Sequence, residues 1–339
     1  MASGVFGLDI GRSFVKVVQI KSTGNKKMLI GAGTTVTPGG GIMSESPIEL
    51  KKVADSIKSC VETAKIDTDK CAVSLIESQV VSRLISFPTL TDKELSAAIS
   101  WEAEQYIPLP IKDVNLQYKV ITRPAAGSNE KMSVLLVAAP KRVIAKYINV
   151  VKNAGLTIAA METESAALVR SLTQHEDPTT IIVSMGALST ELVIIKSGSI
   201  VFTRSIATGG FNLTKAISSE FNLPQNQAEQ YKHAYGLDET KLGGKVAAVL
   251  KPILDILVSE ILKAVEFSHT HVGEAPVVRL IITGGGSFLP GLSSYLTEKT
   301  SLEVTLGDPW LSFAKEGIIT KLAGQGSVYS VATGLALRS

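Results

Sequence analysis

Two segments of the chain repeat one pattern of apolar and polar positions. Residues 5–20 and 181–194 each contain an apolar strand, a tight turn and a second apolar strand, with Gly11 in the first turn and Gly186 in the second. Short apolar runs bounded by turn residues are typical of buried strands. Glycine lets the backbone turn sharply and leaves amide N–H groups uncovered, as a phosphate-binding hairpin requires. Two such hairpins can hold a polyphosphate between them.

Strands and helices alternate through the first part of the chain, which favours an α/β fold. A strand near residues 29–36 is followed by a helix near 48–64 and a strand at 72–75. From about residue 78 to 153 the order becomes strand, helix, strand, strand, helix, and a capping box at Thr91–Glu94 starts its first helix. This segment has no glycine-rich loop and no catalytic group of side chains. We therefore expect an inserted module that binds another protein.

The second part of the chain begins at the repeated hairpin and continues into helices. Gly209 and Gly210 lead into one helix, and a second helix at 224–236 carries Glu229 and Lys232 on one face. The simplest account of this pair is a surface ion pair worth about 0.2–0.5 kcal/mol. Contact with a bound nucleotide is the alternative, and the two residues alone do not decide between them.

A long apolar-patterned helical region over 245–272 precedes a strand at 277–283 and a turn of three glycines, Gly284–Gly286. A strand followed by a glycine turn and a helix is a nucleotide-contact arrangement, because the helix N-terminus favours anions. This turn is the third glycine-bearing segment that points to a nucleotide.

Composition narrows the class of protein. The 339 residues exceed one usual core, so we expect two lobes, and 45% hydrophobic with 19% charged residues indicates ordered α/β cores. The net charge of +3 is spread along the chain, which argues against nucleic-acid binding. No apolar run is long enough to span a membrane. Cys60 and Cys71 lack metal-ligand spacing and fit a reducing cytosol.

In this order the segments resemble the actin, sugar-kinase and heat-shock-chaperone ATPase superfamily. Within it the chain is similar to the PilM family of cytoplasmic actin-like proteins of type IV pilus assembly, relatives of the division protein FtsA. Besides the hairpins, the resemblance rests on the segments 99–108 (ISWEAEQYIP), 134–139 (VLLVAA), 282–287 (ITGGGS) and 331–338 (VATGLALR). It covers nearly the whole chain, and the ordered set is more specific than any single glycine turn.

The resemblance implies an actin-like, ribonuclease H-like two-lobed ATPase fold. Its first lobe is expected at 1–77 and 154–178, and its second lobe at 179–339, with a helical part at about 212–272. The segment 78–153 is expected to be an inserted subdomain of the FtsA 1C (SHS2) type. The implied location is cytoplasmic, peripheral to the inner membrane through partner proteins.

The same resemblance implies ATP and magnesium as cofactors. Asp9 would face magnesium through its water shell, and an otherwise unpartnered buried carboxylate in an apolar strand would be costly. Lys16 would contact a phosphate, or else be a solvated strand residue; Arg12 either contacts a phosphate or projects into solvent. The implied nucleotide contacts are Gly11, Arg12, Ser13, Lys16, Gly186, Gly209, Gly210, Glu229, Lys232, Gly284, Gly285 and Gly286.

One departure from the superfamily pattern bears on catalysis. The second hairpin commonly carries Asp-x-Gly, whereas this chain has Ser184-Met185-Gly186, so the catalytic position is degenerate. A serine carries no negative charge to orient metal-bound water, and phosphoryl transfer depends on positioning and charge neutralisation. We therefore expect ATP binding with slow or absent hydrolysis.

The implied partners are the cytoplasmic N-terminal peptide of PilN, the assembly and retraction motor ATPases of the pilus, and a second copy of the chain. Trp101 and Tyr106 are candidates for a peptide groove, although a core role for Trp101 is an equal alternative. An FtsA-like division protein and an actin-like filament are other functions of the same fold, and a small-molecule kinase is a third. The chain ends without the basic amphipathic helix expected of FtsA, which favours the pilus function.

Overall fold

The computed structural model of the chain describes residues 4–24, 26–125, 128, 130–271 and 276–338. The strands are β1 (Phe6–Ile10), β2 (Phe14–Thr23), β3 (Lys26–Val36), β4 (Lys70–Leu75), β5 (Val81–Phe87), β6 (Val114–Thr122), β7 (Met132–Pro140), β8 (Thr157–Thr163), β9 (Thr180–Met185), β10 (Thr190–Lys196), β11 (Ser199–Ile206), β12 (Arg279–Thr283) and β13 (Glu303–Leu306). The helices are α1 (Pro47–Thr63), α2 (Asp92–Ala103), α3 (Lys141–Asn153), α4 (Glu164–Leu172), α5 (Gly210–Phe221), α6 (Gln225–Tyr235), α7 (Lys245–His271), α8 (Leu292–Thr300), α9 (Ile318–Lys321) and α10 (Ser330–Ala336).

Two five-stranded sheets share one topology. The first has the order β3-β2-β1-β4-β8 and the second the order β11-β10-β9-β12-β13. In each, three consecutive antiparallel strands are followed by two parallel strands. The central strands β1 and β9 are almost fully buried, as their continuous apolar sequences predict. The repeated hairpin of the sequence is therefore the start of a repeated sheet, as the predicted two-lobed fold requires.

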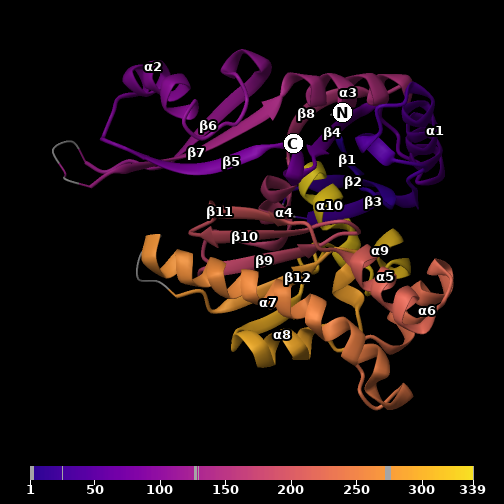
Figure 1. Cartoon of the computed structure of the whole chain (residues 1–339). Helices are drawn as coiled ribbons and strands as arrows, with labels where there is room; N and C mark the ends of the chain where they lie inside the picture. Colours follow the sequence, from indigo (N-terminus) through magenta and orange to yellow (C-terminus); the bar gives the residue numbers. More distant parts are fainter. Residues whose placement is uncertain (1–3, 25, 126–127, 129, 272–275, 339) are drawn as a thin grey trace.

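Helices form layers on and between the two sheets (Figure 1). The outer face of the first sheet packs on α1 and α3, and the outer face of the second on α7 and α8. Between the sheets lie α4 and α10. On α4, Leu168 packs against Ile182 and Val193 of the second sheet, while Ala167 packs against Ala72 of the first and Leu335 of α10. Because α4 contacts both sheets, it joins the two lobes.

Two glycines allow this middle layer to approach closely. A Cβ atom at Gly7 of β1 would lie 1.9 Å from the carbonyl oxygen of Ala332, and one at Gly334 of α10 would lie 1.9 Å from that of Ala167. No side chain fits at such distances, so α10 packs with its backbone directly on the first sheet and on α4.

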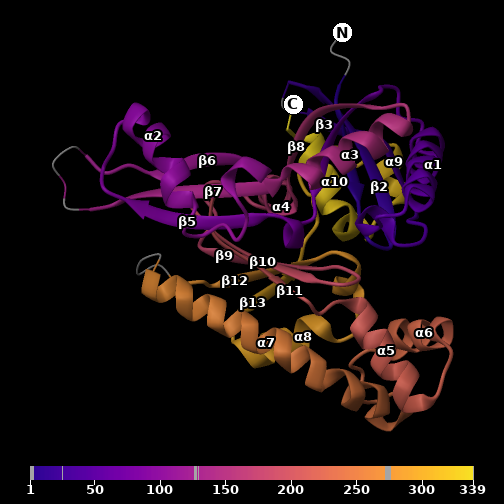
Figure 2. The same ribbon diagram turned by 45° about the horizontal axis from the view of Figure 1, so that its top comes forward.

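The inserted module projects from the first lobe (Figures 1 and 2). Its sheet has the order β5-β7-β6, and α2 covers one face with Leu95 and Ile99 packed on Val134 and Leu136. The capping box at the start of α2 is present. The last helix of the expected 78–153 module, α3, packs apart from the core of that module. It packs in the core of the first lobe through side chains such as Tyr147.

The C-terminal segment also differs from the expected boundary of the second lobe. After β13 the chain returns to the first sheet, where Trp310, Tyr329 and Ala332 pack with Val18 and Leu29. The expected division assigned the whole of 179–339 to the second lobe. The first lobe is instead completed by the end of the chain, which a linear division of the sequence does not reveal.

Candidate functional site

A cleft of about 1520 Å³ lies between the two sheets and is lined from both lobes. Of the site residues predicted from the sequence, those that line it are Asp9, Gly11, Arg12, Ser13, Lys16, Ser184, Gly186, Gly210, Glu229, Lys232, Gly284, Gly285 and Gly286. Gly209 is not among the lining residues. Fold topology thus brings four separate glycine-bearing segments, at Gly11, Gly186, Gly210 and 284–286, to one place.

The first hairpin presents a cross-strand ion pair. Asp9 on β1 is directly opposite Lys16 on β2, and the Lys16 Nζ atom lies 2.8 Å from Asp9 Oδ2. Asp9 is 4% exposed. The sequence predicts a metal as the partner of this buried carboxylate, but Lys16 already supplies a cation. The burial of Asp9 therefore does not by itself require a metal.

The turn of the first hairpin is braced by the end of β3. The Gly11 N–H donates to the Phe14 carbonyl at 3.1 Å, and the Thr37 hydroxyl donates to the Gly11 carbonyl at 2.8 Å. The Thr37 N–H donates to the Ser13 carbonyl at 2.9 Å. Arg12 donates to the carbonyl of Gly39 at 2.6 Å, so its guanidinium holds the 38–41 loop at the edge of the cleft.

The second hairpin is fastened to the start of α5. The Gly186 N–H donates to the Ser189 carbonyl, and the Gly210 N–H donates to the Gly186 carbonyl, each at 2.9 Å. The Gly209 N–H donates to Asn212 Oδ1 at 2.9 Å. Since each N–H has one hydrogen and each is in use, none of these three glycines offers a free donor to a phosphate. A Cβ at Gly209 would lie 2.6 Å from the Ala187 carbonyl oxygen, so packing against this hairpin explains the glycine.

Glu229 and Lys232 belong to a hydrogen-bond network around the buried Lys232 ammonium group, with Glu229 half-exposed, and are not a simple surface pair. The Lys232 Nζ atom lies 2.8 and 2.7 Å from the two Glu229 carboxylate oxygens, 2.9 Å from Thr214 Oγ1 and 3.2 Å from the Gly210 carbonyl. Lys232 is 7% exposed. Burial acts to raise the pKa of Glu229, but hydrogen bonds from Lys232 and Thr214 outweigh it and hold the pKa below its usual value. His233 also lies 3.0 Å from Glu229.

The glycine turn after β12 meets the second hairpin. Gly284 has φ +82°, and a Cβ there would lie 2.6 Å from the Met185 carbonyl oxygen; a Cβ at Gly286 would lie 2.4 Å from the Met185 side chain. The resemblance implies nucleotide contacts at all three glycines. Packing within the protein explains Gly284 and Gly286, whereas a Cβ at Gly285 would have no atom within 4 Å.

Three carboxyl groups of the cleft were not identified from the sequence: Glu77, Glu164 and Glu191. Burial raises the pKa of Glu77. Desolvation, with the charges of Asp9 and Glu191, raises the pKa of Glu164 well above its usual value. Burial raises the pKa of Glu191 to about 7, although a hydrogen bond from Ser205 opposes the rise.

Glu191 adds a carboxyl group to the second hairpin, in which the expected aspartate position is Ser184. It lies on β10 directly opposite Ser184 of β9. The sequence held one signal for it, because Glu191 follows Ser184 by seven positions, just as Lys16 follows Asp9. Across the part of the chain that the structure describes, no three His, Cys, Asp or Glu side chains are arranged to bind a metal directly.

Comparison with known proteins identifies the family. A family model described as "Type IV pilus assembly protein PilM" matches residues 7–339. The chain belongs to the PilM family. A solved structure described as the PilM–PilN type IV pilus biogenesis complex is 28% identical and covers 99% of this chain and 98% of that chain, with a TM-score of 0.86.

More distant relatives of this PilM-family chain share its fold. Cell division protein FtsA of Enterococcus hirae is 24% identical over 350 residues, 89% of this chain and 78% of that protein. The structure of MreB 5 of Spiroplasma citri bound to AMPPNP is 14% identical, covers 98% of this chain and 95% of that chain, and has a TM-score of 0.54. These likenesses show the actin-like fold alone.

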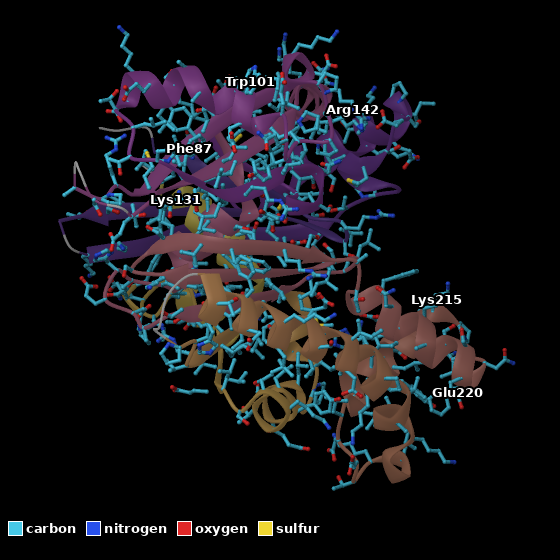
Figure 3. All side chains as sticks on the ribbon, turned by 60° about the vertical axis from the view of Figure 1, so that its left-hand side comes forward. Phe87, Trp101, Lys131, Arg142, Lys215 and Glu220 are labelled. Carbon is cyan, nitrogen blue, oxygen red and sulfur yellow. The ribbon has the colours of Figure 1, made fainter. Side chains whose placement is uncertain are left out.

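The inserted module of this PilM-family chain carries exposed apolar side chains. Trp101 on α2 is 78% exposed, and its position on the outside of the module is visible in Figure 3. The core role considered for Trp101 is therefore wrong. Tyr106, Leu109 and Tyr118 of the same module are also exposed.

Among the helices that the structure describes, none combines the length and the apolar character that a membrane span requires.

Proposed function

We propose that this chain is a nucleotide-binding adaptor of type IV pilus assembly that binds the cytoplasmic N-terminal peptide of PilN. The observation that carries the proposal is the likeness, along 99% of the chain, to the structure described as the PilM–PilN complex. In this role the chain contacts the membrane only through partner proteins, and the motor ATPases of the pilus and a second copy of the chain are further candidate partners.

We propose that ATP binds in the cleft. The open space beside Gly285 fits a flat base, the Lys232–Glu229 network lies where ribose hydroxyls can bond, and Lys16 supplies a point charge for phosphates. AMPPNP in MreB 5 of Spiroplasma citri supports this use of the fold. Asp9 and the other carboxyl groups of the cleft, Glu77, Glu164 and Glu191, fit a hydrated magnesium ion, since Mg²⁺ keeps several of its waters. Bound magnesium would neutralise phosphate charge.

Nucleotide binding by the cleft has a direct test. Isothermal titration of the purified chain with ATP and magnesium should give a saturable heat. The variant Lys232→Met removes the network beside Gly210 and should weaken binding, whereas Lys215→Met on the exposed face of α5 should leave it unchanged (Figure 3). Absence of heat with the wild-type chain would contradict the proposal.

Peptide binding has a separate test. A synthetic peptide of the PilN N-terminus should bind the purified chain in the presence of ATP, and a peptide of the same composition in scrambled order should not. If the PilN peptide fails to bind while ATP binds normally, the adaptor function is wrong and an actin-like filament or division function gains support. Light scattering with and without ATP then distinguishes a filament from a monomeric protein.

We also propose slow ATP hydrolysis, because Ser184 carries no charge at its position on β9. Steady-state phosphate release from the purified chain should be far slower than the exchange of bound nucleotide. Rapid phosphate release by the wild type that is lost in Asp9→Asn would contradict slow hydrolysis. It would not contradict the proposal that ATP binds in the cleft.

A further inference from the structure

Glu191 is the centre of a polar row that crosses the second sheet. In the sheet register, Ser184 of β9 is opposite both Thr283 of β12 and Glu191 of β10, and Glu191 is opposite Ser205 of β11. Residues directly opposite on neighbouring strands point to the same face, with Cβ atoms about 4.5–5.5 Å apart in antiparallel pairs. All four side chains line the cleft. The second sheet thus presents one carboxyl group among three hydroxyls to the cleft.

The first sheet presents an equivalent row with different charges. Asp9 of β1 is opposite Lys16 of β2, which is opposite Thr34 of β3, and all three line the cleft. The carboxylate of this row is on the first strand of the hairpin and is neutralised by Lys16 at 2.8 Å. In the second row the carboxyl group is on the returning strand, and no cation pairs with it in the described part of the chain.

Glu191 has an unused acceptor in a buried position. The residue is 4% exposed, and Ser205 Oγ donates to its Oε1 atom at 2.7 Å. Its Oε2 atom has no hydrogen-bond partner among the described residues, although the Ser189 hydroxyl is near enough to favour the ionised form. A buried polar atom without a partner is destabilising, because it has lost its hydrogen bonds to water. Such an atom in the wall of a ligand cleft is accounted for by a group that arrives with the ligand.

We infer that Glu191 is the carboxylate through which the second lobe faces the hydrated magnesium ion of a bound nucleotide. The inference rests on the proposed function. Its chemistry follows from the two rows: magnesium prefers oxygen ligands and retains water, and Glu191 Oε2 is an oxygen acceptor without a hydrogen-bond partner among the described residues. Ser184 is directly opposite Glu191 in the sheet register, and both side chains line the cleft. Glu191 thus brings a carboxyl group to the cleft from the strand next to Ser184, without replacing a carboxylate at position 184 itself.

The alternative is that Glu191 is a structural acid held by Ser205. Glu191→Gln separates the two, because an amide keeps an acceptor for Ser205 and loses the negative charge. We would measure the affinity of a fluorescent ATP analogue in magnesium and in EDTA, for the wild type and Glu191→Gln. Glu162→Gln is the control, because Glu162 is a carboxylate with 7% of its side chain exposed that pairs with Arg170 and does not line the cleft.

The wild type and Glu162→Gln should bind the analogue about tenfold more tightly in magnesium than in EDTA, which corresponds to about 1.4 kcal/mol. Glu191→Gln should lose most of this enhancement and keep its affinity in EDTA, because the magnesium-facing charge is gone and the phosphate contacts remain. The exchange Ser184→Asp with Glu191→Ser should restore the enhancement, and it provides the test if Glu191→Gln does not fold.

These outcomes separate a failure of the role of Glu191 from a failure of the nucleotide site. Full magnesium enhancement in Glu191→Gln overturns the role of Glu191 and leaves the nucleotide site standing. A wild-type chain that binds no analogue in either buffer overturns the nucleotide site and this inference with it. An exchange variant that folds, binds in EDTA and gains nothing from magnesium also overturns the role of Glu191.

Discussion

Glu77 and Glu164 each accept a backbone hydrogen bond from the segment that carries the other. Glu164 Oε2 accepts the N–H of Glu77 at 3.2 Å, and Glu77 Oε2 accepts the N–H of Ser165 at 3.3 Å. Glu77 begins a 3-10 turn (Glu77–Gln79) between β4 and the inserted module, and Glu164 begins α4 between the two sheets. The pair therefore fastens the entry of the inserted module to the helix that joins the lobes.

This contact predicts a pH dependence of stability. Burial raises the pKa of Glu77 in the folded chain, so the folded state binds its proton more tightly than the unfolded state does. The free energy of unfolding should therefore fall as the pH rises above about 4.5, the unfolded value. Glu77→Gln can still accept from Ser165 and has no charge, so urea unfolding between about pH 5.5 and 8 should show a smaller fall than in the wild type.

The control for this prediction is Glu94→Gln. Glu94 is an exposed acid of the capping box, and hydrogen bonds from Thr91 lower its pKa, so its contribution is lost only as the pH falls. The slope above about pH 5.5 should therefore match that of the wild type. Equal slopes in all three proteins would show that the Glu77 carboxyl does not titrate on unfolding in this range.

The Lys232 network predicts a loss of stability on removal of its charge. Lys232→Met leaves Glu229, Thr214 and the Gly210 carbonyl without their shared donor, and hydrogen bonds to charged groups are worth about 1.5–3 kcal/mol. We expect urea unfolding to show a decrease of about that size. Lys215→Met, on the exposed side of α5, should change the free energy of unfolding by less than about 0.5 kcal/mol. Equal free energies of unfolding for the two variants would contradict a stabilising role of the Lys232 network.

The close packing of α10 on α4 predicts that an alanine at position 334 destabilises the protein. Gly334→Ala in α10 would place a Cβ atom 1.9 Å from the Ala167 carbonyl oxygen. Alanine normally favours a helix by about 1 kcal/mol over glycine, but forced overpacking costs about 1–3 kcal/mol or more. Thermal unfolding should therefore show a lower midpoint for Gly334→Ala, and an unchanged one for Gly4→Ala, where the nearest atom lies 4.0 Å away. A higher midpoint for Gly334→Ala would mean that α10 lies farther from α4.

The exposed face of the inserted module predicts a binding effect without a stability effect. Trp101→Ala should weaken binding of the PilN peptide by about tenfold or more, as truncation of a buried interface tryptophan does. Its thermal midpoint should stay that of the wild type, because the side chain is 78% exposed in the free chain. Ile256→Ala removes an exposed apolar side chain from α7 and should affect neither property. Undiminished peptide binding by Trp101→Ala would place the peptide elsewhere.

The sequence by itself determined the fold class and the segments that meet in the cleft. Apolar strands, the turns at Gly11 and Gly186 and the glycine run after β12 are contiguous patterns, so their local physics is visible in the chain. The capping box of α2 was predicted for the same reason. The order of these patterns then led to the family that the comparisons confirm.

Only the tertiary structure decided which side chains act together. Strand register sets Glu191 opposite Ser184 and Lys16 opposite Asp9, and register is a property of two strands, not of one. The N–H groups of Gly209 and Gly210 looked free in sequence because their acceptors are supplied by folding. The return of the C-terminal segment to the first sheet was hidden for the same reason: burial of an apolar helix face depends on partners that are distant in the chain.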